Sequence, residues 1–275
     1  MTSSIKRCAI GAIIFGLFSC EKHQSSNYSK VNDNYKPNAT VAQITDKLNS
    51  SFSQNKPDSL ESFFADWNKS VSPNTNGFVH QNDTIAAVFS VYKAFYKPFN
   101  LLVLGKWEWG NNLNSRSKYA VLQNKIYFLT LPADGINYFS WKSLKRDSIN
   151  NFRPLTDLPS DKVLYLTTEY SKSINIFLGD ESTSLGEGNI MNPSRPTGNS
   201  KKRYNALVNY IPLLHGHWKN YWHLETHPEV SLVLFNKTLT EARVYFRVGY
   251  EGGVATLMKV DVNWVIKASE STWIE

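Results

Sequence analysis

The sequence predicts an α+β domain in which N-terminal helices pack on a curved antiparallel sheet. Apolar residues recur at helical spacing over residues 41–95, and β-branched and aromatic residues fill strand-length runs over residues 229–268. Of the 275 residues, 41% are hydrophobic and 13% are aromatic, which excludes a disordered chain. We therefore expect one domain over residues 40–275, formed mainly by these helices and C-terminal strands. Residues 101–200 form a mixed insertion or a second lobe in its middle.

Three helices are predicted at the N-terminal end of this domain. The first follows an apolar stripe from Val41 to Phe52 with three- and four-residue steps. The second begins at Asp58, whose carboxylate can cap the helix, while Glu61, three positions later, completes a capping box. The third begins near Asp83 and must stop near Pro98, because proline interrupts helical hydrogen bonding.

The middle of the chain mixes strand and helix patterns. Two β-rich runs, Tyr119–Leu122 and Ile126–Leu131, are separated by Gln123-Asn124-Lys125, which predicts a hairpin. The other predicted elements are a strand at Val163–Leu166, a helix at Glu169–Leu178, a long loop at Gly179–Asn199 and a helix at Arg203–Ile211.

The C-terminal residues predict a four-stranded meander. Its strands are Glu229–Phe235, Ala242–Tyr250, Val254–Val260 and Trp264–Ala268. The segments Glu251-Gly252-Gly253 and Asp261-Val262-Asn263 are predicted to be tight connections. Apolar and polar residues alternate over residues 243–248, which predicts one buried and one solvated face.

Parts of this meander resemble the closing strands of NTF2-like (SnoaL-like) domains. The similar segments are residues 242–246, Gly252-Gly253, residues 264–266 and residues 272–275. The resemblance implies N-terminal helices against a curved antiparallel sheet, forming a cone whose mouth can hold a ligand. Enzymes of that family use an acid–base pair inside the cone, but none of their motifs can be placed on this sequence, so no catalytic residue is carried over.

The first twenty residues have the pattern of an export signal. Lys6 and Arg7 precede an apolar run from Cys8 to Phe18, which is shorter than the roughly 20 residues needed to span a bilayer as a helix. Leu17-Phe18-Ser19-Cys20 resembles the lipobox of bacterial outer-envelope lipoproteins, although Phe18 is bulkier than usual. The resemblance implies cleavage after residue 19 and lipidation of Cys20. An ordinary secretory signal, cut without lipidation, is the alternative.

The export prediction constrains location and partners. Attached acyl chains such as palmitate would anchor the mature chain to the membrane, and residues 20–39 would form a flexible tether. The lipoprotein resemblance places it at the outer membrane, because Glu21 replaces the aspartate typical of inner-membrane retention. Removing Lys6 and Arg7 with the signal lowers the formal net charge from +7 to +5, and exported location argues against nucleic acid as a partner. An envelope protein or a glycan is the expected partner class.

One segment, residues 215–227, contains four of the six histidines and is the candidate metal site. Imidazole and carboxylate groups bind zinc, and three protein ligands plus water would activate that water. The five candidate ligands are His215, His217, His223, Glu225 and His227.

The spacing limits this metal hypothesis. Leu224 replaces the glutamate of the His-Glu-x-x-His motif, and Pro228 disfavours a helix through His227. In a strand, positions 223 and 227 are about 13 Å apart at roughly 3.3 Å per residue, so they need a bend to share an ion. Two alternatives stay open: the histidines form ordinary hydrogen bonds on a strand face, or they act without metal in acid–base chemistry or carbohydrate contact.

Two further candidate sites follow from residue type. Arg195, Lys201, Lys202 and Arg203 form a basic cluster that could bind an anion such as lipid phosphate or an acidic glycan, or could simply be solvated. Exposed Trp107, Trp109 or Trp141 could stack on sugars.

Together these observations predict a lipid-anchored cell-envelope protein with a binding or structural role. The alternatives are a hydrolase or lyase that uses the histidines of residues 215–227, and a carbohydrate-binding accessory lipoprotein. The sequence contains no complete dinucleotide-binding glycine motif, phosphate loop or Gly-x-Ser-x-Gly elbow. No cofactor is therefore expected other than a divalent metal such as zinc at the histidines.

Overall fold

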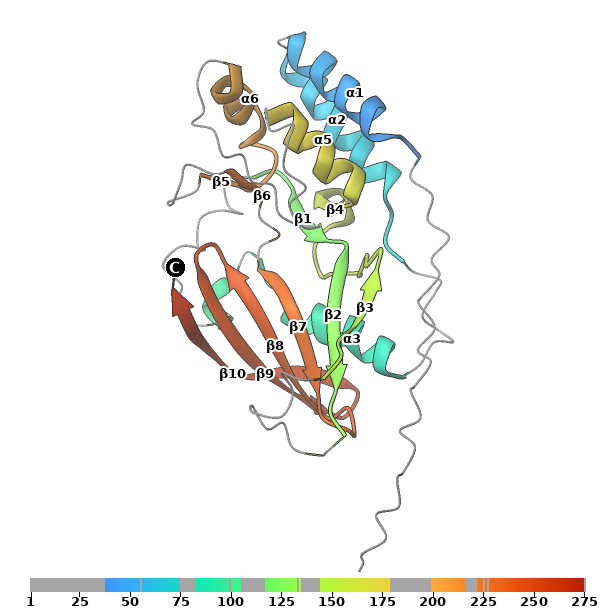
Figure 1. The fold of residues 1–275 in the computed structure, drawn as a ribbon, viewed down its shortest axis with the longest axis vertical. Helices are drawn as coiled ribbons and strands as arrows, with labels where there is room; N and C mark the ends of the chain where they lie inside the picture. The colour runs from blue at the N-terminus through green and yellow to red at the C-terminus, as the bar shows by residue number, and fades with distance from the viewer. Residues whose placement is uncertain are drawn as a thin grey trace, which may run out of the picture.

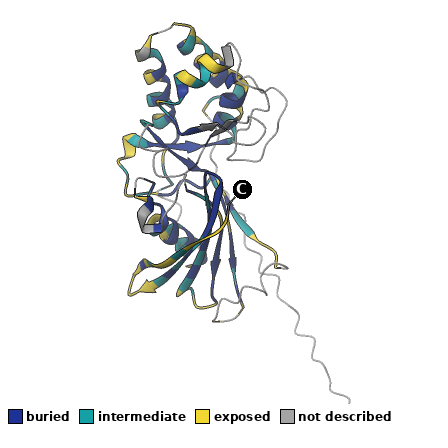
Figure 2. Cartoon of the chain, turned by 90° about the vertical axis from the view of Figure 1, so that its left-hand side faces the viewer, coloured by how far each residue is buried: buried dark blue, intermediate teal, exposed yellow. Residues whose placement is uncertain are grey.

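A computed structural model of the protein describes residues 38–54, 56–74, 83–98, 100–104, 117–132, 134, 144–178, 199–215, 222–224, 226 and 228–274. Helices α1, α2, α5 and α6 gather at one end of the molecule, a six-stranded sheet occupies the other end, and α3 lies behind that sheet (Figure 1). The predicted α+β class is confirmed. Buried residues concentrate in the strands and on the inner helix faces (Figure 2).

The helices are close to the predicted ranges. They are α1 (Val41–Ser53), α2 (Pro57–Ser70), α3 (Asp83–Phe95), α5 (Thr168–Leu178) and α6 (Asn199–Leu207), with short 3₁₀ turns η1 (Leu101–Leu104) and η2 (Ser160–Lys162). The helix predicted at Arg203–Ile211 therefore begins four residues earlier and ends four earlier. Within the described residues, no helix is long and apolar enough to cross a membrane.

The capping box lies on a different helix from the one predicted. In α1, the Gln43 amide N–H donates to the Thr40 hydroxyl at 3.3 Å, and the Thr40 N–H donates to the Gln43 side chain at 2.8 Å. In α2 the N-cap is Lys56, which makes no side-chain cap hydrogen bond, and Pro57 follows at the first helical position. Asp58 is thus a first-turn acid, not the cap.

The main sheet has the strand order β10-β9-β8-β7-β2-β3. Its strands are β2 (Lys125–Thr130), β3 (Asp147–Asn150), β7 (Glu229–Phe235), β8 (Glu241–Val248), β9 (Glu251–Val260) and β10 (Asn263–Ile274). Strands β7 to β10 form the predicted antiparallel meander, whereas β2 pairs with β7 in parallel. The middle of the chain thus supplies two strands of this sheet.

The hairpin predicted around residues 123–125 is wrong. Strand β1 (Ala120–Gln123) pairs in parallel with β4 (Val163–Leu166), and β2 pairs with β3 and β7, so β1 and β2 do not pair with each other. The chain continues from one sheet into the next through Asn124. Its carbonyl accepts a hydrogen bond from the Phe152 N–H at 2.6 Å, so the polar residues mark a junction between two sheets.

The connection predicted at residues 251–253 is also wrong. Glu251, Gly252 and Gly253 lie in β9, opposite Val248, Arg247 and Phe246 of β8. The turn is formed by Gly249 and Tyr250, where Gly249 adopts φ 59°. The next turn falls where predicted, at Asp261 and Val262, and Asp261 has φ 54°.

The predicted alternation of β8 is confirmed on its buried face. Val244, Phe246 and Val248 are buried, and the residues between them are half-buried. The second face is also partly covered: Leu129, Leu131, Leu232 and Leu234 form a second buried cluster there, with Tyr245 packed against it. The main cluster is continuous from Ile44 to Trp264, so it joins the helical end to the sheet.

Candidate functional site: the groove between α3 and β10

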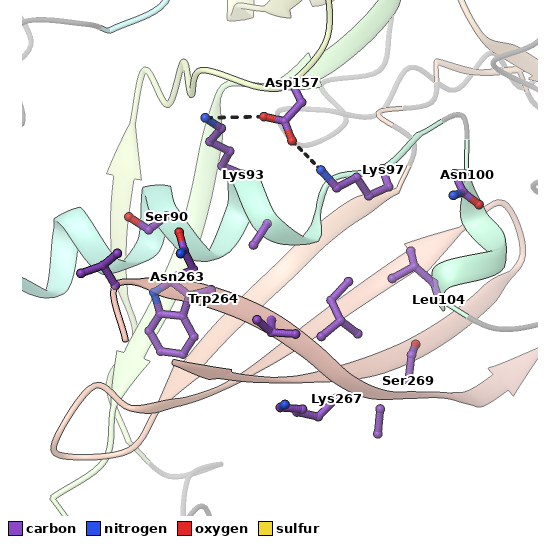
Figure 3. A pocket seen from close by; sticks show the side chains of 15 residues that line it. Ser90, Lys93, Lys97, Asn100, Leu104, Asp157, Asn263, Trp264, Lys267 and Ser269 are labelled. Atoms are coloured by element: carbon purple, nitrogen blue, oxygen red, sulfur yellow. Dashed lines mark hydrogen bonds and ion pairs between the residues drawn. The ribbon is translucent and has the colours of Figure 1, made fainter. Parts of the chain in front are cut away.

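An open groove of about 990 Å³ lies between α3 and β10 (Figure 3). One wall is α3 with the residues that follow it, and the other is a continuous run of the chain from Val262 to Ser269. The helical wall contributes Ser90, Lys93, Ala94 and Lys97. Ser90, Lys93 and Ala94 share one face of α3, and Lys97 lies two residues beyond the end of the helix at Phe95.

The packing of α3 explains why this face remains open. The opposite face of the helix carries Val88, Tyr92 and Phe95, all with 0% exposure. The Phe95 ring lies 4.9 Å from that of Phe246 in β8, centroid to centroid. Since the apolar stripe of α3 is used against the sheet, its polar margin faces β10 across the groove.

The floor of the groove is apolar. Trp264 is 8% exposed and its ring lies 5.9 Å from that of Phe235, so the indole is fixed by the core. Leu104 from η1 is fully buried, and Ile266 packs against the main core. The Ser269 hydroxyl is buried without a hydrogen-bond partner among the described residues. The groove therefore offers apolar contact at its floor.

The rim is basic. The Lys97 ammonium lies 2.6 Å from one oxygen of Asp157, and the Lys93 ammonium lies 3.5 Å from the other (Figure 3). The Lys97 hydrogen bond holds the pKa of Asp157 below its ordinary value, and both lysine charges add to this effect. Lys267 lies on the strand side and makes no ion pair within the described chain. Lys93 and Lys97 thus share one carboxylate, while Lys267 lines the groove at a distance from Asp157 (Figure 3).

Lys267 is placed by an irregularity in β10. Ile266 pairs with Leu257 and Ala268 pairs with Thr256, so Lys267 is an extra residue in a β-bulge. A bulge leaves the extra residue outside the regular ladder and locally increases strand twist.

The candidate metal ligands are only partly within the described residues. His215 lies in β5 (Leu213–His215) opposite Trp222, and His223 lies in β6 (Trp222–Leu224) opposite Leu214. By strand alternation, positions 215 and 223 belong to opposite faces of this hairpin. His217, Glu225 and His227 lie outside the described residues. Within the part of the chain that is described, no three His, Cys, Asp or Glu side chains form a metal-binding group.

The residues of the predicted basic cluster have different environments in the structure. Arg203 donates to the Phe177 carbonyl at 2.6 Å, and its guanidinium carbon lies 5.0 Å from the centre of the Phe177 ring. It therefore satisfies a carbonyl in the last turn of α5. Lys201 and Lys202 are exposed. Arg195, Cys20, Trp107, Trp109 and Trp141 lie outside the described residues, so lipidation and sugar stacking stay predictions.

The α3–β10 groove was not predicted from the sequence. The spacing of Lys93 and Lys97 could have placed both cations on one helix face. Asp157 and Lys267 lie far away in the sequence and reach the groove only through tertiary packing.

Comparison with known proteins finds no match: no protein-family profile, no curated protein and no solved structure is similar to this chain. The lipoprotein and NTF2-like resemblances therefore stay predictions, and the function must be argued from the residues.

Proposed function

We propose that the protein is a lipid-anchored cell-envelope protein whose folded domain has a binding role, with the α3–β10 groove as its binding site. The proposed anchor is supported by the apolar leader that ends at Cys20. The binding role is supported by one observation above all, an open groove of about 990 Å³ that combines an apolar floor with a basic rim.

The groove has the chemistry of a recognition site. Ligand sites in proteins are typically concave, largely apolar and supplied with a few fixed polar groups. Here Trp264 and Val265 line the groove with apolar side chains, while Lys93 lies on a helix that the core holds in place and Lys97 follows that helix. These residues suit a ligand that carries both negative charge and apolar groups.

The anchor is tested by labelling growing cells with tritiated palmitate. We expect label on the full chain and none on Cys20→Ala. Cys8→Ala is the matched control, because this cysteine lies inside the predicted leader and its replacement leaves the lipidated position intact. Label retained by Cys20→Ala would exclude lipidation at that residue.

The binding role is tested by a photo-reactive phenylalanine analogue at position 265. Val265 lines the groove and is 40% exposed, and Tyr127 on β2 is also 40% exposed but lies outside it, so position 127 is the matched control. We expect a discrete adduct at position 265 in intact cells that is lost when Lys267→Glu is added. Cross-linking at position 265 that does not exceed that at position 127 would contradict a binding role for this groove.

A further inference from the structure

Among the described residues, strand β10 is an edge of the main sheet. It is 12 residues long and pairs only with β9 among the described strands. Alternate backbone N–H and C=O groups along such an edge point away from the sheet and are able to pair with another strand. The edge is therefore a site where an extended chain could add.

The lining of the groove shows that it follows this edge. All eight residues from Val262 to Ser269 line it. Successive residues of a strand point to opposite faces of the sheet, so a groove over one face would be lined by every second residue. A groove lined by consecutive residues runs along the backbone edge itself, and α3 forms its second wall (Figure 3).

The charges in the groove favour an acidic occupant. Among the residues that line the groove, three are lysines, Lys93, Lys97 and Lys267, and one is acidic, Asp157. A second copy of this chain, paired edge to edge through its own β10, would bring one lysine and one glutamate, Lys267 and Glu270, and so offers no excess of negative charge to the groove. An acidic segment would instead complement the excess of lysine among the residues that line the groove.

We propose that an extended acidic segment of a partner polypeptide adds to β10 as a seventh strand, between β10 and α3. This inference rests on the proposed function and names the partner class of the same groove. The segment pairs with residues 263–266 and again beyond the bulge at Lys267, where the ladder is interrupted. About eight extended residues, roughly 26 Å at about 3.3 Å each, would fill the groove.

The side chains of the segment would alternate between two environments. Those on the inner side contact Trp264 and Ile266, and those on the other side contact Lys267 and solvent. Strand addition derives its affinity from backbone hydrogen bonds and its specificity from alternate side chains. The preferred segment therefore alternates apolar and acidic residues.

The test uses the purified full chain in detergent and synthetic eight-residue peptides. The probe alternates glutamate and valine, and a control peptide alternates lysine and valine. A third peptide repeats the acidic sequence with N-methyl groups on the backbone amides that would face β10. We expect binding by the first peptide only, together with slowed hydrogen exchange at alternate amides of residues 263–271.

Variants of the lysines test the charge argument. Lys97→Glu and Lys267→Glu should each weaken binding of the acidic peptide about three- to tenfold. Lys47→Glu is the matched control for Lys97→Glu, because Lys47 on α1 also pairs with an aspartate, Asp66, at 2.5 Å. Lys267→Glu removes no ion pair within the described chain, so it stays informative if Lys97→Glu weakens the fold.

Two results would overturn strand addition. One is equal binding of the methylated and unmethylated acidic peptides, and the other is binding without slowed exchange in β10. Binding of an acidic polysaccharide such as polygalacturonate in place of the peptide would also exclude it, while leaving a binding groove. Failure of the cross-linking experiment at position 265 would instead remove the proposed function itself.

Discussion

The side-chain amide of Gln123 pairs with the backbone of Val230 as a neighbouring strand would. Its nitrogen donates to the Val230 carbonyl at 2.8 Å, and its oxygen accepts from the Val230 N–H at 2.7 Å. The same nitrogen also donates to the Lys125 carbonyl at 2.8 Å. Gln123 is 5% exposed, so these bonds form away from water at the point where β1 passes into β2.

Replacing Gln123 with leucine should lower the free energy of unfolding by about 2–4 kcal/mol. The change leaves both backbone groups of Val230 buried without their partner, and each such group costs about 1–3 kcal/mol. Urea denaturation measures the effect. Gln54→Leu is the control: the Gln54 side chain is exposed and accepts one hydrogen bond, from the Ser59 hydroxyl at 2.7 Å, so its replacement should cost less than about 1 kcal/mol. Equal effects of the two substitutions would show that the Gln123 amide does not join the sheets.

Gly252→Ala should destabilise the protein by about 1–3 kcal/mol. A Cβ atom at this position would lie 1.9 Å from Cε2 of Trp273, so the indole must move. Tryptophan fluorescence and thermal unfolding report the displacement and its cost.

The control for this prediction is the same substitution in a Trp273→Ala background. There the steric conflict is absent, and alanine is favoured over glycine in a strand by about 0.5–1 kcal/mol. We therefore expect Gly252→Ala to be neutral or stabilising once Trp273 is removed. A cost that persists without the indole would mean that the glycine is required for another reason.

The Asp157→Asn variant should be less stable than the parent chain only above the pH range in which aspartate titrates. The Lys97 hydrogen bond lowers the folded-state pKa of Asp157 from its usual 3.8, so its contribution is present above about pH 4 and disappears as pH falls through the folded-state value. Because the carboxylate is 55% exposed, solvent screens the pair, and we expect a difference in melting temperature of about 1–3 °C at pH 7. A difference that persists unchanged at pH 2 would contradict this origin.

Tyr96→Phe should maintain or increase stability, by up to about 1 kcal/mol. The Tyr96 hydroxyl is buried and has no hydrogen-bond partner among the described residues, so the substitution removes an unsatisfied polar group. The ring of Tyr92, 5.2 Å away, keeps its stacking partner. Guanidinium denaturation at pH 7 measures the change, and a loss above 1 kcal/mol would show that the hydroxyl has a partner.

The same substitution should reduce the sensitivity of the protein to alkali. Burial raises the folded-state pKa of Tyr96 far above its usual 10, whereas an unfolded tyrosine ionises near that value. The free energy of unfolding is therefore unaffected by ionisation of Tyr96 below about pH 10 and decreases as pH rises further. Between pH 9 and 11, Tyr96→Phe should lose less stability than the parent chain, and equal losses would contradict this assignment.

The sequence predicted a helix or strand correctly where the residues at its own two ends determine where it begins and ends. Val163–Leu166 and Glu229–Phe235 were predicted at their exact bounds, because a short apolar run is bounded by polar or turn-forming residues. The alternation of residues 243–248 likewise reports directly on one buried face.

Which strands pair with each other depends on residues that are distant in sequence. Gln123-Asn124-Lys125 resembles a turn, yet β1 pairs with β4 some forty positions later, and nothing local to residues 120–130 encodes that partner. Glu251-Gly252-Gly253 also resembles a turn, but Gly252 is required in β9 because Trp273 covers it. In the groove, only Lys93 and Lys97 were predictable as neighbours, because they are four positions apart in the sequence. The bulge at Lys267 results from the pairing of β10 with β9 and cannot be read from the residues of β10 alone.

The parallel pairing of β2 with β7 has a consequence for how the chain assembles. Strands β7 to β10 follow one another and are joined by short turns, so they can associate as soon as they are synthesised or translocated. The contact of Gln123 with Val230 spans 107 positions and must await closure of that long loop. The rate of folding should therefore be limited by the pairing of β2 with β7. Until β2 pairs, the edge of β7 can pair with another chain, which leads to aggregation.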